Sequence, residues 1–391
     1  MIYLFINAFH DSLEHLGLYR YFQVFRWEEF RTLCALIFSF FFVVLNGKRV
    51  IRWLLKQKIG DNPEFHHADL NRLMTSKSST PTMGGLLIAS AILVSTILLA
   101  DVTNFYVLMA MICMIWLACL GAIDDWMKLT GARRALASGT RTREGLRPWE
   151  KLVFQIGLAV LLGLFTRYYG VNTDAAHVLN LPGQRTYVPG TGQIEAGVII
   201  LGPGAFALLA IFVVTGASNA VNLTDGMDGL ASGIMGIVSF AFIVLTLGTG
   251  QITWSKFLLI PYIPGSAELA VIAGAMVGSC LGFLWWNCHP AHVFMGDTGS
   301  LPLGGLIGYI ALVVRQEFLL LIIGGVLVFE ALSVILQVSY FKSTGGSRLF
   351  KCTPIHHHFH LSGWTEQQVV VRFWLITALL AAIGLATLKL R

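Results

Sequence analysis

The most constraining feature of this chain is a series of long apolar segments that recurs from one end to the other. A helix needs about 20 apolar residues to cross roughly 30 Å of hydrocarbon. Ten segments approach that length: 31–49, 83–100, 105–123, 152–169, 197–216, 230–248, 269–286, 301–314, 318–341 and 369–388. Only 12% of the residues are charged, whereas about 25% is usual in soluble domains. The sequence therefore predicts an all-α polytopic membrane protein in which residues 1–391 form a single integral membrane domain.

The eighth segment, residues 301–314, is the shortest of the ten, so a re-entrant or buried helix is the alternative to a full span there. The first 30 residues lack the basic start, apolar stretch and cleavage pattern of a signal peptide, so we expect them to stay on the mature protein. The six cysteines include no CxxC pair, which argues against a disulfide framework or a zinc ribbon.

Lysine and arginine are distributed unevenly between the predicted loops. Most of the 27 follow the odd-numbered segments or flank the loops after them. By the positive-inside rule those loops are cytoplasmic, and both termini are periplasmic. On the periplasmic side, Pro-Gly pairs flank residues 184–188 and predict a small exposed hairpin. The net charge of +6 requires no nucleic-acid partner, because basic residues beside spans are an ordinary orientation signal; the alternative is that some bind anionic lipid or phosphate.

The loop after the fifth segment reads NLTDGMDGL over residues 222–230. If the residues continue a helix, Asn222, Asp225 and Asp228 share one face, because neighbours three apart lie on the same side. Gly226 and Gly229 remove side chains beside them and would let a ligand or a second segment approach the backbone closely.

Two other cytoplasmic loops carry carboxylates. Asp124 and Asp125 follow the third segment directly, and ionising both is unfavourable unless a cation or donor lies nearby. Asp297 lies among Gly296, Thr298 and neighbouring small residues. A single carboxylate in such a turn suits Mg²⁺ beside phosphates, because Mg²⁺ usually takes its other oxygen ligands from phosphate and water; the alternative is an aspartate in a capping turn.

The remaining loops contribute basic, hydroxyl and imidazole groups. Residues 77–85 read KSSTPTMGG, and the ammonium of Lys77, the hydroxyl of Thr82 and the backbone amides at a helix start can bind phosphate. Lys151 opens the fourth segment. Residues 354–360 read PIHHHFH, and these imidazoles can bind phosphate or carry a proton near pH 7. The alternative is a zinc site that combines residues 356–358 with Cys352, Cys288 or His292, although no ligand spacing supports it.

The positions of these motifs separate two classes of function. A transporter or proton pump is expected to carry ionisable residues inside its spans, whereas here the motifs all fall on the cytoplasmic side. Glu330, in the ninth segment, is the main exception. This distribution favours an enzyme that acts at the membrane surface on one water-soluble and one lipid substrate.

The motifs together resemble one family. KSSTPTMGG, Asp124-Asp125, NLTDGMDGL, FMGDTGSL at 294–301 and TPIHHHFHLSGWTEQQVVVRFW at 353–374 are similar to the polyprenyl-phosphate N-acetylhexosamine-1-phosphate transferases, glycosyltransferase family 4. The similarity runs from residue 21 to 374. The triple histidine and the following Gly-Trp-x-Glu favour the branch that transfers phospho-N-acetylmuramoyl-pentapeptide over the branch that transfers N-acetylglucosamine phosphate.

The resemblance implies a reaction and a location. UDP-MurNAc-pentapeptide would react with undecaprenyl phosphate in the presence of Mg²⁺, giving lipid I and UMP at the bacterial inner membrane. A homodimer is common in the family. Direct attack by the lipid phosphate and a two-step route through a phospho-enzyme both stay open. The segment 136–148, which precedes Lys151, looks longer and richer in arginine than is usual in the family.

The resemblance also implies roles for individual residues. Asp297 would bind Mg²⁺, with Asp125 close by, and Asp124 would be the base or the nucleophile. His356 would act with them in catalysis. Phosphate or substrate contacts would come from a larger set: Lys77, Thr82, Lys151, Asn222, Asp225, Asp228, Asn287, Phe294, Gln337, His357 and His358.

Overall fold

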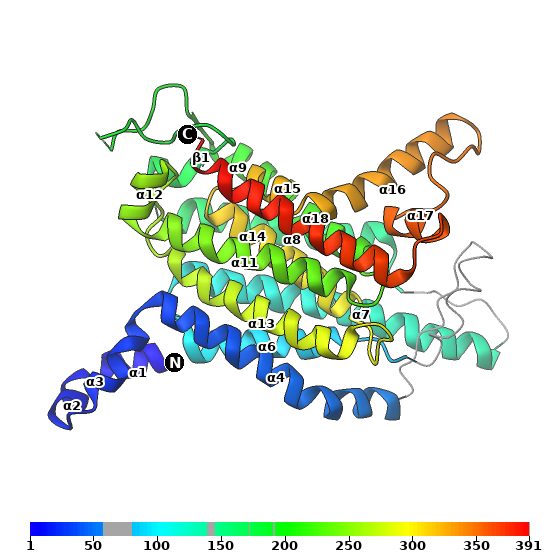
Figure 1. Cartoon of the computed structure of the whole chain (residues 1–391), viewed down its shortest axis with the longest axis horizontal. Coiled ribbons are helices and arrows are strands. Elements are labelled where there is room, and N and C mark those ends of the chain that lie inside the picture. Colours follow the sequence, from blue (N-terminus) through cyan, green and yellow to red (C-terminus); the bar gives the residue numbers. More distant parts are fainter. Residues whose placement is uncertain (58–79, 139–144, 172, 191, 391) are drawn as a thin grey trace.

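The computed structural model of the protein describes residues 1–57, 80–171, 173–190 and 192–390 apart from 139–144, and leaves the side chains of 132–138 undescribed. The described chain is a bundle of roughly parallel helices with almost no strand (Figure 1). The prediction of an all-α membrane protein is therefore confirmed. Lys77 lies outside the described residues, so its expected phosphate contact has no structural counterpart here.

Each of the ten predicted segments forms a helix. In the described part of the chain, eight stretches are long and apolar enough to cross a membrane: α4 (Glu28–Lys56), α7 (Phe105–Ser138), α8 (Pro148–Tyr169), Pro203–Thr224, α11 (Leu230–Gly250), Ser266–Asn287, α16 (Gly325–Ser343) and α18 (Glu366–Thr387). Two shorter apolar helices complete the set, α6 (Gly85–Leu99) and α14 (Asp297–Val313).

Two of these stretches are composite. Pro203–Thr224 contains α9 (Pro203–Ala210), a π-helical turn η4 (Ile211–Thr215) and α10 (Gly216–Thr224). Ser266–Asn287 begins with a 3-10 turn, η5 (Ser266–Glu268), and continues as α13 (Leu269–Asn287). The short elements outside the long helices are α1 (Ile2–Ala8), α2 (His10–His15), α3 (Tyr19–Phe22), η1 (Gln23–Arg26), η3 (Asp174–His177), β1 (Val178–Leu179), β2 (Ile199–Ile200), α12 (Ile252–Leu258), α15 (Glu317–Ile323) and α17 (Ile355–Leu361).

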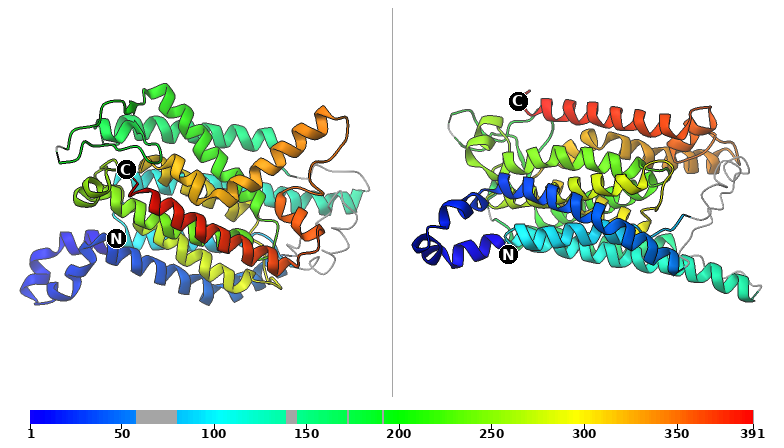
Figure 2. Two further views of the ribbon diagram at one scale, coloured as in Figure 1. Left: turned by 45° about the horizontal axis from the view of Figure 1, so that its top comes forward. Right: turned by 60° about the horizontal axis from the view of Figure 1, so that its bottom comes forward.

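Both termini lie at one end of the bundle, and α17 lies at the other (Figure 1). This arrangement matches an even number of crossings. The predicted hairpin is present at the end that holds the termini: β1 pairs antiparallel with β2, and an isolated bridge joins Tyr187 to Ile194 beyond it. Two further views show α1 to α3 standing away from the bundle, and the end of α7 projecting beyond its neighbours on the opposite side (Figure 2).

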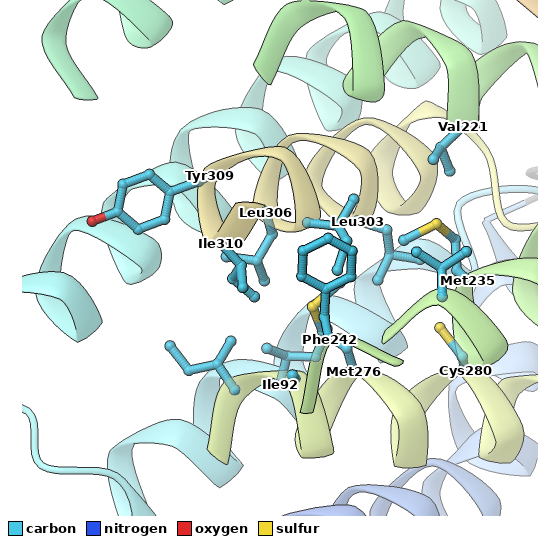
Figure 3. Packing of buried hydrophobic residues seen from close by; sticks show 14 of the residues in the cluster. Ile92, Val221, Met235, Phe242, Met276, Cys280, Leu303, Leu306, Tyr309 and Ile310 are labelled. Carbon is cyan, nitrogen blue, oxygen red and sulfur yellow. The ribbon is translucent and has the colours of Figure 1, made fainter. Parts of the chain in front are cut away.

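The core of the bundle is α14, every residue of which is buried. Leu303, Leu306 and Ile310 extend from α14 toward Phe242 of α11 and Met276 of α13 (Figure 3). A helix of 17 residues is about 25 Å long, which is less than a full hydrocarbon core. Because protein surrounds it on all sides, α14 can be short without exposing backbone polar groups to lipid. The weakest predicted span is thus a buried central helix.

Three predicted boundaries were wrong. The third segment does not end at residue 123, because α7 continues through Asp124 and Asp125 to Ser138. The fifth begins at Pro203 and runs to Thr224 instead of ending at 216. The ninth is interrupted at Gly324, between α15 and α16. Hydropathy shows where apolar residues are dense, but a helix can continue into a polar region when its side chains are bonded there.

Candidate active site

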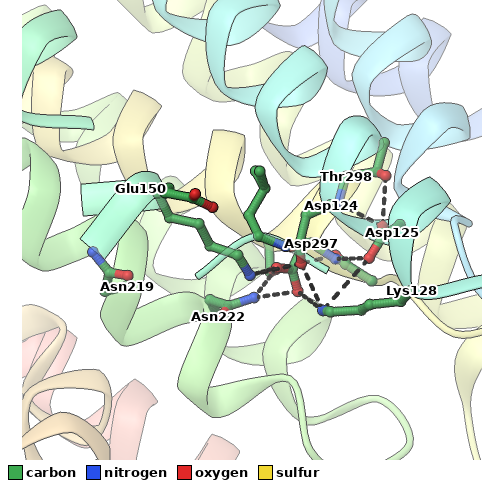
Figure 4. A network of polar contacts seen from close by, with 12 residues as sticks. Asp124, Asp125, Lys128, Glu150, Asn219, Asn222, Asp297 and Thr298 are labelled. Carbon is green, nitrogen blue, oxygen red and sulfur yellow. Dashed lines mark hydrogen bonds and ion pairs between the residues drawn. The ribbon is translucent and has the colours of Figure 1, made fainter. Parts of the chain in front are cut away.

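Three carboxylates meet at the end of the bundle that lies opposite the termini. Asp124 and Asp125 are on α7, and Asp297 is the first residue of α14. Their oxygen atoms lie within 4.8 Å of one another, and all three side chains are buried. Asp297 lies at the centre of the surrounding polar network (Figure 4). The structure thus brings together residues that are 172 positions apart along the chain.

Asp125 holds the start of α14 in place. Its Oδ1 accepts a hydrogen bond from the Asp297 amide at 3.2 Å, and its Oδ2 accepts from the Thr298 amide at 2.9 Å and the Thr298 hydroxyl at 2.6 Å. A carboxylate at a helix N-terminus is favoured by the unpaired amides and by the helix dipole. Gly121 permits this close approach, because a Cβ there would overlap the backbone of Asp297.

Two lysines join Asp124 to Asp297. The Lys128 ammonium lies 2.8 Å from Asp124 and 3.3 Å from Asp297, and the Lys151 ammonium lies 2.6 Å and 2.5 Å from the same two carboxylates. The structure thus places Lys151 in the cluster despite the unusual segment before it. Lys128 was missed by the sequence prediction. It lies one helical turn after Asp124, so it would have been found if α7 had been expected to continue.

Asn222 also contacts Asp297 directly. Its amide donates to Asp297 Oδ1 at 2.8 Å and to the Ser300 hydroxyl at 2.9 Å. Asp225 follows in the turn between α10 and α11. Burial, together with the negative charges of Asp297 and Asp125, raises the pKa of Asp225 to about 7. A cation or a basic group of a ligand would therefore be stabilised beside it.

The expected single face of Asn222, Asp225 and Asp228 is not formed. The helix ends at Thr224, and a turn leads to Gly229, which has a φ of 81° and is followed by α11. The turn places Asp228 away from Asn222, beside His289 and Glu366. Its Oδ2 lies 3.0 Å from His289 Nδ1, and its backbone amide donates to Glu366 at 2.9 Å. Asn287 supports the same turn, because its Oδ1 accepts from the Gly229 amide at 3.0 Å.

The two glycines of this turn do allow the close approach that was predicted. A Cβ on Gly226 would overlap the imidazole of His356, and a Cβ on Gly229 would press on Leu284. This contact places His356 against the turn that carries Asp225. The glycine next to Asp225 indicated in the sequence that another segment could approach closely. The sequence did not indicate which segment this would be.

Thr82 and Phe294 lie on adjoining backbone segments. The Phe294 amide donates to Pro81 at 2.8 Å, and the Gly84 amide donates to the Phe294 carbonyl at 2.8 Å. Thr82 is buried, and its hydroxyl would lie 3.0 Å from a Cβ on Gly296. Both residues therefore flank the turn that leads into Asp297.

Gln337 and His358 are placed differently. Gln337 Oε1 accepts from the amides of Leu349 and Phe350, and His358 Nδ1 accepts from the Lys351 amide at 3.2 Å. These bonds organise the loop between α16 and α17 and do not reach the carboxylate cluster. His357, by contrast, is buried beside His356, with ring centroids 4.1 Å apart.

The chemistry of the donor set suits a hard divalent cation. Carboxylate oxygens from Asp124, Asp125 and Asp297 are the ligand type that Mg²⁺ prefers. Asp125 already accepts amide hydrogen bonds with both oxygens, so Asp124 and Asp297 are the better ligands. Among the described residues, no group with metal-ligand spacing contains His356, Cys352, Cys288 or His292, which removes support from the zinc alternative.

Comparisons with known proteins show the family of this chain. The profile described as Glycosyl transferase family 4 matches residues 106–315. A protein named phospho-N-acetylmuramoyl-pentapeptide-transferase from Thermodesulfovibrio yellowstonii is 41% identical over 396 residues, which cover 100% of both chains. Relatives with the same name from Desulfotalea psychrophila and Rickettsia bellii are 41% and 39% identical; they cover 95% and 94% of this chain and 96% of their own lengths.

Proposed function

The chain belongs to glycosyl transferase family 4, and from this premise we propose that it transfers phospho-N-acetylmuramoyl-pentapeptide from UDP to undecaprenyl phosphate. The products would be lipid I and UMP, in the first membrane step of peptidoglycan synthesis. The full-length relatives carry the name of this activity. The observation that carries the proposal is a group of three buried carboxylates, bridged by the ammonium groups of two lysines, at one end of the helical bundle.

This group fits the electrostatic problem of the reaction. Joining a lipid phosphate to a pyrophosphate brings several negative charges together, so catalysis depends mainly on neutralising and positioning them. The ammonium groups of Lys128 and Lys151 lie between Asp124 and Asp297. When phosphates enter, these ammonium groups can pair with phosphate oxygens while they stay near the carboxylates.

We further propose that the site uses Mg²⁺. Asp297 and Asp124 would hold the ion, and Asn222 would orient Asp297 through its 2.8 Å hydrogen bond. When bound, the metal would neutralise and align phosphate oxygens. Asp124 would also accept the proton of the lipid phosphate or act as nucleophile. Its Oδ1 is held by the Leu146 amide at 2.7 Å, which leaves Oδ2 directed at the two lysines.

An apolar cavity offers a place for the lipid chain. It has a volume of about 370 Å³ and lies between the composite span Pro203–Thr224, α14 and the interrupted pair α15–α16. Its wall is almost entirely aliphatic or small, for example Gly216, Ala217, Val328 and Leu332. The π-helical turn and the interruption at Gly324 both border it. We propose that this cavity receives the part of the polyprenyl chain nearest the phosphate.

The orientation follows from the charge pattern. The lysine-rich and arginine-rich end would face the cytoplasm, where UDP-linked donors are made, and both termini would be periplasmic. The protein would thus be a multi-pass protein of the bacterial inner membrane.

A transfer assay tests the proposed function. Purified protein in detergent would receive undecaprenyl phosphate with either UDP-MurNAc-pentapeptide or UDP-N-acetylglucosamine, and release of UMP would be measured. We expect turnover with the first donor and little with the second. Preference for the second would assign the chain to the other branch of the family. Solute accumulation in sealed vesicles without UMP release would instead indicate a transporter.

The metal assignment is tested in the same assay by Asp297→Asn. Removal of the central carboxylate should lower turnover by more than about 100-fold, because even partners that only orient metal ligands typically contribute 10- to 100-fold. Asp174→Asn, in the periplasmic turn η3, is the control. Near-normal, Mg²⁺-dependent turnover in Asp297→Asn would contradict the assignment.

A further inference from the structure

Glu330 is a buried carboxylic acid in a helix whose neighbouring residues face outward. Phe329 and Leu332 on α16 are 54% and 45% exposed, whereas Glu330 is 0% exposed. An ionisable group inside a membrane-spanning helix is costly unless it has a partner. The partner is His356 of α17, which is also 0% exposed. Its Nδ1 lies 3.0 Å from Glu330 Oε2.

This contact determines which ring nitrogen of His356 is left for other partners. When Glu330 is ionised, its oxygens only accept hydrogen bonds, so Nδ1 of His356 is then the donor in this 3.0 Å contact. The other nitrogen, Nε2, is buried and has no hydrogen-bond partner in the described part of the protein. It lies against Gly226, at the turn that follows Asp225.

A buried acceptor without a hydrogen bond costs about 1–3 kcal/mol, so such groups usually have a use. Here the atom is held in a fixed place by two contacts. Glu330 fixes Nδ1, and the neighbouring His357 ring packs at 4.1 Å between centroids. A Cβ on Gly226 would overlap Nε2, so this ring nitrogen lies directly against the turn that follows Asp225.

We propose that Glu330 is a positioning residue for the transfer reaction. It holds His356 in the tautomer with Nδ1 protonated, so that Nε2 accepts a hydrogen bond from a hydroxyl or amide N–H group of the UDP-linked donor. The UDP-linked donor carries many hydroxyl and amide N–H groups, whereas the lipid phosphate has at most the one proton that Asp124 is proposed to accept, so we assign the contact to the donor substrate. The inference rests on the proposed function and adds a residue from inside a membrane span to the site.

Two substitutions distinguish the hydrogen bond that Glu330 accepts from His356 from the negative charge of Glu330. Glu330→Gln keeps an oxygen that accepts from Nδ1, and Glu330→Leu has similar size but no acceptor. We expect kcat/KM for UDP-MurNAc-pentapeptide to fall about 10- to 100-fold in Glu330→Leu, by analogy with the loss of a partner that orients a metal-binding histidine. It should stay within about threefold in Glu330→Gln. KM for undecaprenyl phosphate should not change in either variant. Phe329→Leu, on the exposed side of the same helix, is the matched control.

A double-mutant cycle tests whether Glu330 acts through His356. In a His356→Gln background, Glu330→Leu should change kcat/KM less than about twofold. A full additional loss would overturn the inference, as would a Glu330→Gln variant as impaired as Glu330→Leu. If Glu330→Leu does not fold, Glu330→Asn replaces it, because its amide is one methylene too short to keep the 3.0 Å bond. An inactive wild-type protein would reject the proposed function instead of this inference.

Discussion

At the scale of single residues, the site is controlled by how its carboxylates are neutralised. Asp124 and Asp297 share two ammonium groups, and Asp125 is satisfied by the amides at the start of α14. Asp225 differs from these three, because burial and the charges of Asp297 and Asp125 raise its pKa to about 7. The ionised form of Asp225, in the turn between α10 and α11, is therefore unfavourable, and a positively charged ligand can stabilise it.

This property makes stability depend on pH. In the unfolded chain an aspartate has a pKa of about 3.9, so the folded protein binds the proton of Asp225 more tightly. The contribution of Asp225 to stability is greatest below pH 4 and falls as the pH rises toward 7. In Asp225→Asn this loss is absent. Without divalent metal, the melting temperature of Asp225→Asn minus that of wild type should increase from pH 5 to 7 and then level off. A difference in melting temperature that decreases from pH 5 to 7 would contradict the raised pKa of Asp225.

At the scale of elements, two irregular spans border the apolar cavity. A π-helical turn interrupts Pro203–Thr224, and Gly324 separates α15 from α16. Such interruptions are often found at functional sites. They leave a hollow against α14 that straight, fully packed helices would fill.

Filling this cavity should affect only the lipid substrate. Val328→Trp adds a large side chain to the cavity wall, and overpacking costs about 1–3 kcal/mol. We expect KM for undecaprenyl phosphate to rise about tenfold while KM for the UDP-linked donor stays unchanged. Phe329→Trp, which faces outward from the next position of α16, should leave both constants unchanged. Equal effects of the two substitutions would exclude the cavity as the lipid site.

At the scale of the whole molecule, the arrangement of the helices separates two ends. The termini and the β1–β2 pair lie at one end, and the carboxylate cluster and α17 lie at the other (Figure 1). A buried ion pair between Arg31 and Glu268, at 2.7 Å, joins α4 to η5 near the first of these ends. The proposed site thus lies at one end of the bundle, opposite the termini.

The orientation of this bundle can be measured with fusions to the C-terminus. Alkaline phosphatase attached after residue 391 should be active, and green fluorescent protein at the same place should be dark, because the positive-inside rule puts both termini in the periplasm. The same two reporters fused after residue 343, where α16 ends, should give the opposite result. Fluorescence from the C-terminal fusion would reverse the orientation and move the site out of the cytoplasm.

The amino-acid sequence alone was enough to predict the class of protein, the ten helical segments and most of the motifs that meet at one end of the bundle. It did so because hydropathy and charge bias reflect how each segment interacts with lipid and water, which is a local property. The same local logic predicted close approach at Gly226 and Gly229, and the structure confirms it. Local patterns could not show how far α7 continues beyond its apolar part.

Which polar groups meet depends on the packing of distant helices. Asp228 was expected beside Asn222 and Asp225, but the turn directs it to His289 and Glu366. Lys128 enters the site because α7 continues and its glycine at 121 lets α14 begin against Asp125. Glu330 on α16 contacts His356 on α17, and no sequence periodicity predicts that these two segments meet. The physical reason is that such contacts depend on how distant helices dock, and docking is set by packing in the core and not by the local sequence.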